Sequence, residues 1–482
     1  MSRLIRDEEL DSLVRTAPWM PQDGRAAERF ERVDHAVLGS AALLLIVAAV
    51  GGPAAGRRFF VPVRAGSGGG LEEAHGHEEF DVAAVTRALA GGRLHTARGG
   101  VVEFRGPGGT PGAVRQLPFD QGWSSNALSL VDVAGTPCIH KTYRRLDEPV
   151  HEPELLRRLT DTGRTPSWWG DYAYLDPVSG ARHPLGVLYR YARGDGIDVP
   201  LRENLRSMWP RIGEASPDAV AVSHLRPLEG MLTAAGHFLR GLHHDLGERL
   251  GSGAAYPVRS ALADATRRVD DLDRAAGLPL PAAARSTAFT ALRTELRSLA
   301  GDFDGAAPAA GPCHGDLHLS HLLCERDSGT PWRMTVIDLS TPALSPADPR
   351  WAEQSPLQDV VAIERALEYF AADEAAFESA RRLGVDSLET MLGTLDSALR
   401  LPEAQRDVHT GVFAAADAWR ERVLHLLLGE RATPDDPLRR LLYVRRLLHE
   451  LAYNQAHARP YHAAIDLRHA RALQPTARLA RK

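Results

Sequence analysis

Residues 314–321 read HGDLHLSH, and residues 336–339 read VIDL. Each stretch holds one aspartate. Asp316 lies in a segment rich in histidine, whereas Asp338 follows two β-branched residues. Two carboxylates in such different settings suggest two different tasks, and the rest of the chain has to supply the partners that those tasks need.

The spacing within the first stretch matches the catalytic loop HRDxxxxN of protein kinases. In that loop the aspartate orients the attacking hydroxyl and accepts its proton, and the residue five positions later holds a metal ion. The spacing therefore predicts that Asp316 is the catalytic base and that His321 occupies the metal position. Asp338 then corresponds to the aspartate of the DFG motif, which binds Mg²⁺ beside the phosphates of ATP.

A predicted β-hairpin carries the candidates for nucleotide binding. Residues 120–146 contain two runs of alternating or β-branched character around the turn signal at residues 135–137. Lys141 lies on the second run, and Glu154 lies near the start of the helical segment 152–159. Kinases hold the phosphates with a strand lysine that pairs with a helix glutamate, so we expect this pair here. The serine-rich bend before the hairpin is the candidate nucleotide loop, with Ser124, Ser125 and Asn126.

The composition along the chain predicts three parts. Residues 1–105 are expected to form an N-terminal cap of strands and one helix, ending at a glycine-rich joint. Residues 106–195 are expected to form a strand-rich lobe with the nucleotide loop and the hinge, where Tyr189 and Tyr191 are further nucleotide contacts. Residues 196–482 are mostly helical and should carry the catalytic and acceptor sites. The predicted fold is α+β: a bilobal, protein-kinase-like arrangement with an additional small N-terminal α+β cap.

Composition and charge exclude several classes of protein. The chain has 482 residues, 44% of them apolar, which is enough for more than one core. A net charge of -5 provides no basic field for nucleic acid, so a small-molecule or nucleotide ligand is expected. Cys138, Cys313 and Cys324 show no CxxC spacing and fit reduced thiols. Charges throughout the N-terminal segment argue against a signal peptide, so we expect a cytoplasmic protein.

Residues 36–56 contain no charged side chain and have roughly the length of a membrane span. The cluster Gly51-Gly52-Pro53 interrupts this run, and RRFFVPVRA follows directly. A buried strand, a turn and a second strand are therefore predicted in preference to a membrane contact. A membrane-tethered protein is the alternative, which purification without detergent would test.

Three stretches carry a family resemblance: HGDLHLSHLL, VIDL and SPLQDVVAIERALEYFA at residues 355–371. They resemble the actinobacterial maltokinases and glucosamine kinases, relatives of the aminoglycoside phosphotransferases. Maltokinases typically show HGDLHLGQ, VIDFEGEP and SPLRDVA at these places, and the resemblance extends over nearly the whole chain. It implies a kinase-like fold and a sugar kinase that uses ATP as co-substrate and Mg²⁺ at positions 321 and 338. A monomer is expected.

Two departures from the maltokinase pattern lie in the metal region. His321 replaces a glutamine, and LSTPA at residues 339–343 replaces FEGEP. A neutral imidazole can ligate a metal, but Mg²⁺ prefers oxygen donors. His321 is therefore expected either at the metal itself or at a metal-bound water or phosphate oxygen.

The acceptor is expected to be an amino sugar, whose ammonium group requires a nearby carboxylate. Residues 347–356, ADPRWAEQSP, offer carboxylates and an aromatic face directly after the metal loop. His449 and Asn454 replace a tyrosine and a glutamate of the maltokinase helix, which argues against maltose. The candidate acceptor residues are Asp316, His318, Asp348, Trp351, Glu353, Gln354, Glu450 and Tyr453.

The preferred reaction is phosphorylation of glucosamine to glucosamine 6-phosphate. Alternatives are a maltokinase that forms maltose 1-phosphate, and a phosphotransferase that acts on an aminoglycoside or another amino sugar. A pseudokinase that binds without turnover is the alternative outside the enzymes. Mg²⁺-dependent release of ADP with different acceptors discriminates among them.

Overall fold

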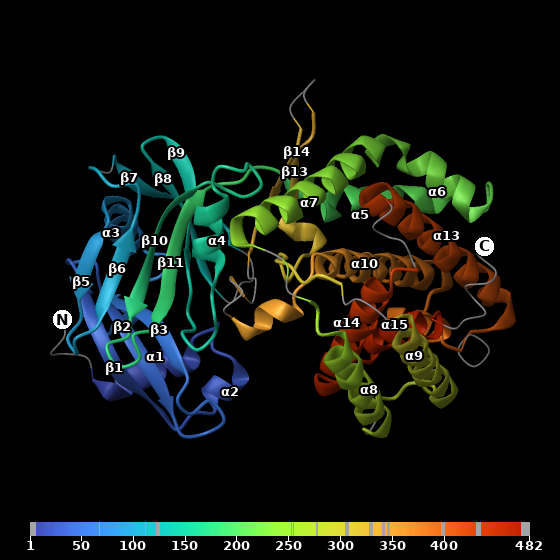
Figure 1. Cartoon of the computed structure of the whole chain (residues 1–482), viewed down its shortest axis with the longest axis horizontal. Helices are drawn as coiled ribbons and strands as arrows, with labels where there is room; N and C mark the ends of the chain where they lie inside the picture. The colour runs from blue at the N-terminus through green and yellow to red at the C-terminus, as the bar shows by residue number, and fades with distance from the viewer. Residues whose placement is uncertain are drawn as a thin grey trace. The chain divides into compact units, whose positions relative to one another are not determined.

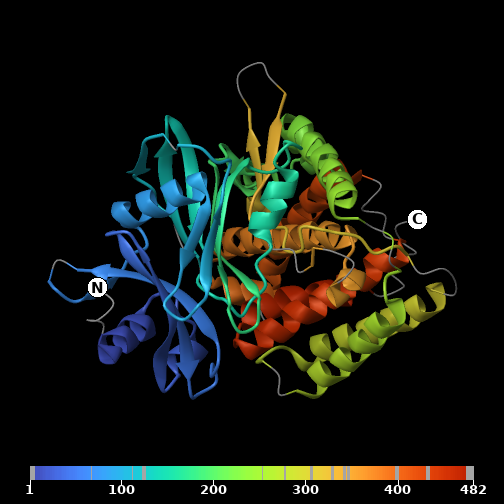
Figure 2. The same ribbon diagram turned by 60° about the vertical axis from the view of Figure 1, so that its left-hand side comes forward.

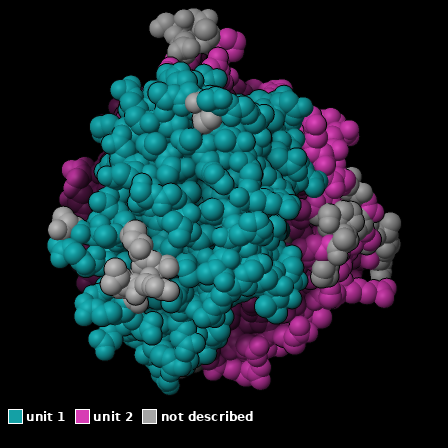
Figure 3. All heavy atoms as spheres, turned by 90° about the vertical axis from the view of Figure 1, so that its left-hand side faces the viewer, with its two compact units in different colours: residues 1–192 teal, residues 193–482 magenta. Residues whose placement is uncertain are grey.

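The computed structural model describes residues 6–66, 68–110, 112–121, 126–251, 253, 255–275, 278–303, 308–326, 331–339, 343–344, 348–396, 401–429 and 435–473. The chain divides into two compact units, residues 1–192 and 193–482, which are coloured separately in Figure 3. The first unit holds two large sheets, and the second is mostly helical (Figure 1). The predicted α+β class is confirmed. The division into three parts, with a boundary after residue 105, stays a prediction.

The first unit begins with helices α1 (Asp7–Thr16) and α2 (Gln22–Arg25) and a four-stranded antiparallel sheet. Its strands, in spatial order, are β1 (Arg29–Leu38), β2 (Ala42–Val50), β3 (Arg58–Ala65) and β4 (Leu71–Glu73). One face of β2 packs with Leu10 and Val14 of α1, and the other packs with Phe80 and Tyr172. Burial on both faces explains the long apolar run, because neither face needs polar residues.

The predicted hairpin at this run is confirmed: β2 and β3 pair in antiparallel register, with Leu45 opposite Val61. Within the described ranges, no helix combines the length and the hydrophobicity that crossing a bilayer requires. The run at residues 36–56 thus comprises the end of β1, the whole of β2 and the turn that leads to β3.

A seven-stranded antiparallel sheet forms the rest of the first unit, in the order β5-β6-β10-β11-β9-β8-β7. Helix α3 (Glu78–Ala90) contacts β6, β7 and β10, and helix α4 (Glu152–Leu159) contacts β10 and β11 (Figure 1 and Figure 2). The two helices cover opposite faces. His140 on β9 bonds to α3 and its neighbour Lys141 bonds to α4, and adjacent strand residues point to opposite sides. The strands are β5 (Gly92–His95), β6 (Val101–Arg105), β7 (Val114–Leu117), β8 (Ala127–Val133), β9 (Thr136–Thr142), β10 (Trp168–Leu175) and β11 (Arg182–Arg190).

The second unit surrounds the long helix α10 (Leu357–Leu383), which has buried residues on all sides. A three-stranded sheet lies in this unit, in the order β12 (Asp195–Gly196), β13 (Leu322–Glu325) and β14 (Arg333–Val336). Strands β13 and β14 are the two orange strands of Figure 2. The remaining helices are α5 (Asp198–Met208), α6 (Pro217–Leu225), α7 (Glu229–Leu250), α8 (Val258–Arg274), α9 (Ala282–Asp302), α11 (Ser387–Gly393), α13 (Glu403–Leu428), α14 (Pro437–Ala456) and α15 (Pro460–Arg471).

Candidate active site

The β13–β14 hairpin brings the two predicted aspartates into one region of the second unit. The HGD loop (residues 314–321) leads through the 3-10 turn Leu319–His321 into β13, and Asp338 follows β14 by two residues. The backbone N–H of Ile337 donates to the carbonyl of His321 at 3.0 Å, which closes the base of the hairpin. Asp316 and Asp338 keep 52% and 46% of their side-chain surface exposed. Both carboxylates therefore remain open to a ligand.

Asp338 has an unusual backbone conformation. Its φ angle is 61°, in the left-handed region. Residues with a Cβ adopt this region at a cost in energy, and such strain gathers at functional sites. Ala134 and Ala458 share this conformation, so the role of Asp338 is argued from its contacts and not from its φ angle.

A buried carboxylate on α10 fixes the HGD loop. Asp359 accepts hydrogen bonds from the backbone N–H groups of His314 at 2.7 Å and Gly315 at 3.0 Å, and from Nε2 of His243 at 2.8 Å. Burial raises the pKa of Asp359, but His243 and the backbone donors outweigh it and hold the pKa below its usual value. Asp359 is therefore an ionised anchor for the segment that precedes Asp316.

His314 ties the loop to the strand end. Its Nε2 donates to the carbonyl of Ile337 at 3.0 Å, one residue before Asp338. The roles of His314 and Asp359 were missed in the sequence, although Asp359 lies within the SPLQD motif. The available signal was an aspartate in the first turn of a helix, followed directly by the apolar residues 360–363.

In the first unit, Lys141 forms a buried ion pair, but with a different glutamate from the one predicted. Nζ of Lys141 lies 2.7 Å from Oε2 of Glu152, which also accepts from the hydroxyl of Tyr143 at 2.7 Å. Glu154 pairs instead with Arg157 and Arg158, each at 2.7 Å. The predicted pair of Lys141 and Glu154 is therefore wrong. Residues two apart on a helix point in nearly opposite directions, so only one of the two glutamates can face the sheet.

The other predicted nucleotide contacts are less defined. Ser124 and Ser125 lie outside the described residues, and Asn126 immediately precedes β8. Tyr189 is buried on β11 opposite Ile139 of β9. Tyr191 is exposed, and its N–H donates to the carbonyl of Pro137. Their roles in nucleotide binding stay predictions.

Several predicted acceptor residues lie around Asp316. Nε2 of His318 is 3.1 Å from Oδ1 of Asp316, and this hydrogen bond lowers the pKa of Asp316 to about 2 despite partial burial. Nη1 of Arg446, on α14, lies 4.0 Å from the same oxygen. Glu450 accepts from Arg446 at 2.7 Å and from the buried Arg365 at 2.8 Å. The acceptor side of Asp316 is thus lined by donors, and the Glu450 carboxylate is shared by two arginines.

The segment after the metal loop is held by its own contacts. Asp348 caps the 3-10 turn Pro349–Glu353 through the N–H of Arg350 and also pairs with the Arg350 guanidinium. Trp351 and Gln354 are buried, whereas Glu353 is exposed. Tyr453 is exposed and stacks on His457, with ring centroids 4.1 Å apart. Among the described residues, no hydrogen bond or ion pair links Trp351, Glu353, Gln354 or Tyr453 to Asp316, and the acceptor roles of these residues and of Asp348 stay predictions.

The donor set suits a magnesium ion that arrives with a nucleotide. Among the described residues there is no cluster of three or more His, Cys, Asp or Glu side chains that would hold a metal without a substrate. Mg²⁺ is commonly held by one or two carboxylates together with substrate phosphates and water, and Asp338 offers one. Nδ1 of His321 donates to the carbonyl of Asp316 at 3.0 Å, which leaves Nε2 with its lone pair 3.6 Å from Asp338. The nitrogen is well placed but chemically the weaker ligand for Mg²⁺.

Comparison with known proteins defines the class. Residues 188–347 match the phosphotransferase enzyme family, APH, and this segment contains the HGD loop and Asp338. The match confirms the predicted relation of this segment to the phosphotransferases. No curated protein matches the chain by sequence.

Solved structures of glucosamine kinase are similar over nearly the whole chain. Crystal form A is 19% identical with a TM-score of 0.54, over 97% of this chain and 99% of that chain. A complex with glucosamine, ADP and inorganic phosphate is 19% identical with a TM-score of 0.53, over 95% and 97%. At this identity the likeness establishes the fold, and it confirms the predicted kinase-like arrangement with an N-terminal cap.

Proposed function

We propose that the protein transfers the γ-phosphate of ATP to a sugar hydroxyl, with glucosamine as the acceptor and glucosamine 6-phosphate as the product. The observation that carries the proposal is the meeting of Asp316 and Asp338 at the base of one hairpin, both half-exposed and both anchored through backbone contacts. The buried free thiols Cys138, Cys313 and Cys324 suit a reducing cytoplasm.

Asp316 takes the part of the base. With a pKa near 2 it is ionised at neutral pH, so it accepts a hydrogen bond from the acceptor hydroxyl and then its proton as the bond to phosphorus forms. His318 and Arg446 both approach Oδ1, so Oδ2 is the oxygen that we assign to the acceptor. Such a weak base contributes mainly by orienting the hydroxyl, which is what a loose phosphoryl transition state requires.

The nucleotide is assigned to Lys141 and Asp338. Glu152 holds the Lys141 ammonium in one position, where it is ready to contact phosphate oxygens. Asp338 would hold Mg²⁺, which neutralises phosphate charge when it is bound. His321 bonds to the Asp316 backbone and lies beside the Asp338 carboxylate, so it positions the two aspartates relative to each other.

The choice of sugar rests on two opposing observations. The fold follows that of glucosamine kinases over 97% of the chain, which supports an amino sugar. However, Glu450 and Asp348 are both paired with arginines, and Arg446 lies close to Asp316. A positive charge at this place disfavours an ammonium group, so a neutral sugar such as maltose is the second candidate.

The test is Mg²⁺-dependent release of ADP from ATP, with glucosamine, glucose, maltose and an aminoglycoside as parallel acceptors. The Asp316→Asn variant serves as the blank. We expect the largest turnover with glucosamine, and NMR of the product should locate the phosphate on the 6-hydroxyl. Preference for maltose would establish the second candidate. Absence of turnover with all four acceptors, from protein with a cooperative unfolding transition, would contradict the sugar-kinase proposal and favour a binding module.

A further inference from the structure

His321 presents a nitrogen atom to the carboxylate that is proposed to hold the metal ion. Its Nδ1 donates to the backbone carbonyl of Asp316 at 3.0 Å. A neutral imidazole carries a hydrogen on only one of its ring nitrogens, so the other nitrogen, Nε2, has the lone pair. The ordinary pKa of histidine is about 6.5, and the neutral form therefore predominates at pH 8.

This nitrogen lies near Asp338. Nε2 of His321 is 3.6 Å from Oδ2 of Asp338, which is longer than a normal hydrogen bond. Two atoms that bind one small divalent ion through bonds of about 2.1 Å can be up to about 4.2 Å apart, so the nitrogen and the oxygen are close enough to share an ion. The His321 side chain keeps 18% of its surface exposed and Asp338 keeps 46%, so both can be approached from solvent.

The neighbouring histidine has a different relation to its aspartate. Nε2 of His318 lies 3.1 Å from Oδ1 of Asp316, which is a hydrogen-bond distance, and this hydrogen bond lowers the pKa of Asp316. Nε2 of His318 is therefore a donor, with a hydrogen atom between the two groups. Of these two histidines, His321 is the one whose Nε2 can accept a metal ion.

The His321 ring is held in its orientation from several sides. The ring of His318 meets it edge-on, with centroids 5.1 Å apart, and the ring of His314 stacks on it with centroids 5.8 Å apart. The carbonyl of His321 accepts from the N–H of Ile337 at 3.0 Å. A ligand that is already oriented loses little conformational freedom when the metal binds, so its contribution to affinity is retained.

The donor atoms of a site determine which ion it binds best. Mg²⁺ prefers oxygen ligands and gives up its bound water reluctantly. First-row divalent ions such as Mn²⁺ and Co²⁺ also bind carboxylate and phosphate oxygens, but they accept an imidazole nitrogen more readily than Mg²⁺ does. A site that combines one carboxylate, one imidazole and the phosphates of a nucleotide therefore favours a first-row ion.

We propose that this site prefers a first-row divalent ion such as Mn²⁺ over Mg²⁺, and that Nε2 of His321 and the carboxylate of Asp338 bind it together with nucleotide phosphates. The inference rests on the proposed function, since a nucleotide has to supply those phosphates. Mg²⁺ still binds through Asp338, but with lower affinity. His321 thus sets the metal preference, whichever sugar accepts the phosphate.

The test uses the full chain at pH 8, with Mn²⁺ and a β,γ-methylene analogue of ATP that cannot transfer its γ-phosphate. Pulsed electron paramagnetic resonance of the bound Mn²⁺ detects a ¹⁴N nucleus that ligates the ion. We expect this coupling in the wild-type protein, a ¹⁵N coupling in its place when the histidines are ¹⁵N-labelled, and its loss in His321→Gln. His318→Gln is the matched control and should keep the ¹⁴N coupling.

Calorimetric titration of each ion measures the preference itself. With the analogue present, the ratio of the affinity for Mn²⁺ to that for Mg²⁺ should fall about tenfold or more from wild type to His321→Gln, because glutamine offers an oxygen in place of the nitrogen. The nucleotide's own preference between the two ions cancels in this comparison, since it is the same for both proteins. An unchanged ratio would overturn the role of His321 in the choice of metal.

The remaining outcomes separate the metal site from the proposed reaction. Loss of the ¹⁴N coupling in His318→Gln but not in His321→Gln would move the ion to Asp316 and overturn the assignment. Bound Mn²⁺ without a histidine coupling in the wild type would overturn it as well. A protein that binds no Mn²⁺ with the analogue would contradict both the metal site and the proposed nucleotide binding. Absence of turnover with every acceptor and both ions, beside an intact coupling, would contradict the proposed reaction and support the metal site.

Discussion

The HGD loop and the segment at residues 348–354 both offer carboxylates, but they hold them differently. Asp316 and Asp338 are half-exposed, and the backbone just before each of them is fixed, by Asp359 in the first case and by His314 in the second. Asp348 is engaged by the guanidinium and the N–H of Arg350. Both oxygens of Asp348 accept from Arg350 and so cap a turn, whereas the contact of Asp316 with His318 uses Oδ1, and the proposed reaction uses Oδ2.

The same contrast separates the two glutamates of α4. Glu152 faces the sheet and holds Lys141, whereas Glu154 is occupied by Arg157 and Arg158. The contacts that a carboxylate makes, and not its position in a motif, therefore decide whether it can take part in ligand binding. Each of the following variants tests one side of this comparison.

The largest effect is expected at the accessible carboxylate of the HGD loop. Asp316→Asn keeps the shape of the side chain but removes the base, so kcat should fall about 10²- to 10⁴-fold while ATP binding is retained. The measurement is steady-state turnover together with calorimetric titration of ATP. Asp218→Asn, at an exposed position on α6, is the matched control. Turnover of Asp316→Asn at the wild-type rate would remove Asp316 from the mechanism.

The buried anchor should combine a loss of activity with a loss of stability. Asp359→Asn weakens three hydrogen bonds and leaves His243 without its buried partner. We expect the free energy of unfolding to fall by about 2–4 kcal/mol, and kcat to fall at temperatures where the variant is still folded. Urea denaturation and near-ultraviolet circular dichroism separate the two effects. Normal turnover of the folded variant would show that the HGD loop needs no anchor.

This stabilisation should depend on pH in a defined direction. The pKa of Asp359 is lower in the folded protein than its ordinary value, so folding favours the ionised form. The contribution is fully present above about pH 3.9 and is lost as the pH falls through the folded pKa. The difference in unfolding free energy between wild type and Asp359→Asn should therefore be largest near neutral pH and shrink in acid. A difference that grew in acid would contradict the ionised state of the buried Asp359 carboxylate.

The two glutamates of α4 provide an internal control. Lys141→Ala and Glu152→Gln should raise KM for ATP about 10- to 100-fold, because each disrupts a buried charged pair that presents the lysine to phosphate. Glu154→Gln should change KM by less than about twofold, since it breaks only partly exposed pairs. The reverse order would restore the pairing that was predicted from the sequence.

These residues show what could be predicted and why the rest could not. The relation between Asp316 and Asp338 was accessible because a short hairpin sets it locally. An ion pair between Lys141 and a glutamate of α4 was predicted, but the wrong glutamate was chosen. The choice between Glu152 and Glu154 depends on where α4 begins relative to the sheet. Helix boundaries are the least certain part of a prediction from sequence.

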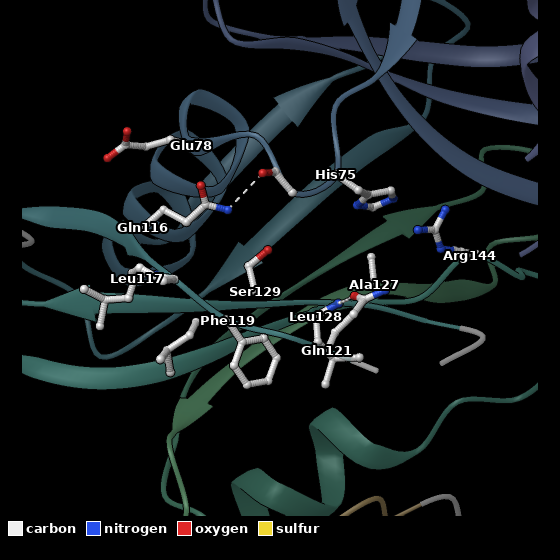
Figure 4. A pocket seen from close by; sticks show the side chains of 13 residues that line it. His75, Glu78, Gln116, Leu117, Phe119, Gln121, Ala127, Leu128, Ser129 and Arg144 are labelled. Atoms are coloured by element: carbon white, nitrogen blue, oxygen red, sulfur yellow. Dashed lines mark hydrogen bonds between the residues drawn. The ribbon is translucent and has the colours of Figure 1, made fainter. Parts of the chain in front are cut away.

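Contacts between residues that lie far apart in the chain could not be predicted, because no sequence pattern marks the two partners. The carboxylate of Asp359 accepts from the N–H of His314, which lies 45 residues earlier in the chain. Arg446 of α14 approaches Asp316 of the HGD loop from a segment that is still further away in the sequence. A cavity beside α3 (Figure 4) is assembled from four separate segments of the first unit, at residues 75–78, 116–121, 127–130 and 144. Its side chains, taken singly, are ordinary residues of strands and turns. The run at residues 36–56 was ambiguous because burial on both faces of β2 removes the alternation that marks a strand.

The smallest effect, and the one that most sharpens the choice of acceptor, is expected at Arg446. Arg446→Gln removes a positive charge 4.0 Å from Asp316 and releases one of the two arginines on Glu450. If the acceptor carries an ammonium group, KM for glucosamine should fall about two- to fivefold, the size of a partly exposed charge interaction, whereas KM for maltose should stay the same. Arg259→Gln, at an exposed position on α8, is the control. A rise in KM for glucosamine would mean that Arg446 binds acceptor hydroxyls directly, and the acceptor would then be better described as a neutral sugar.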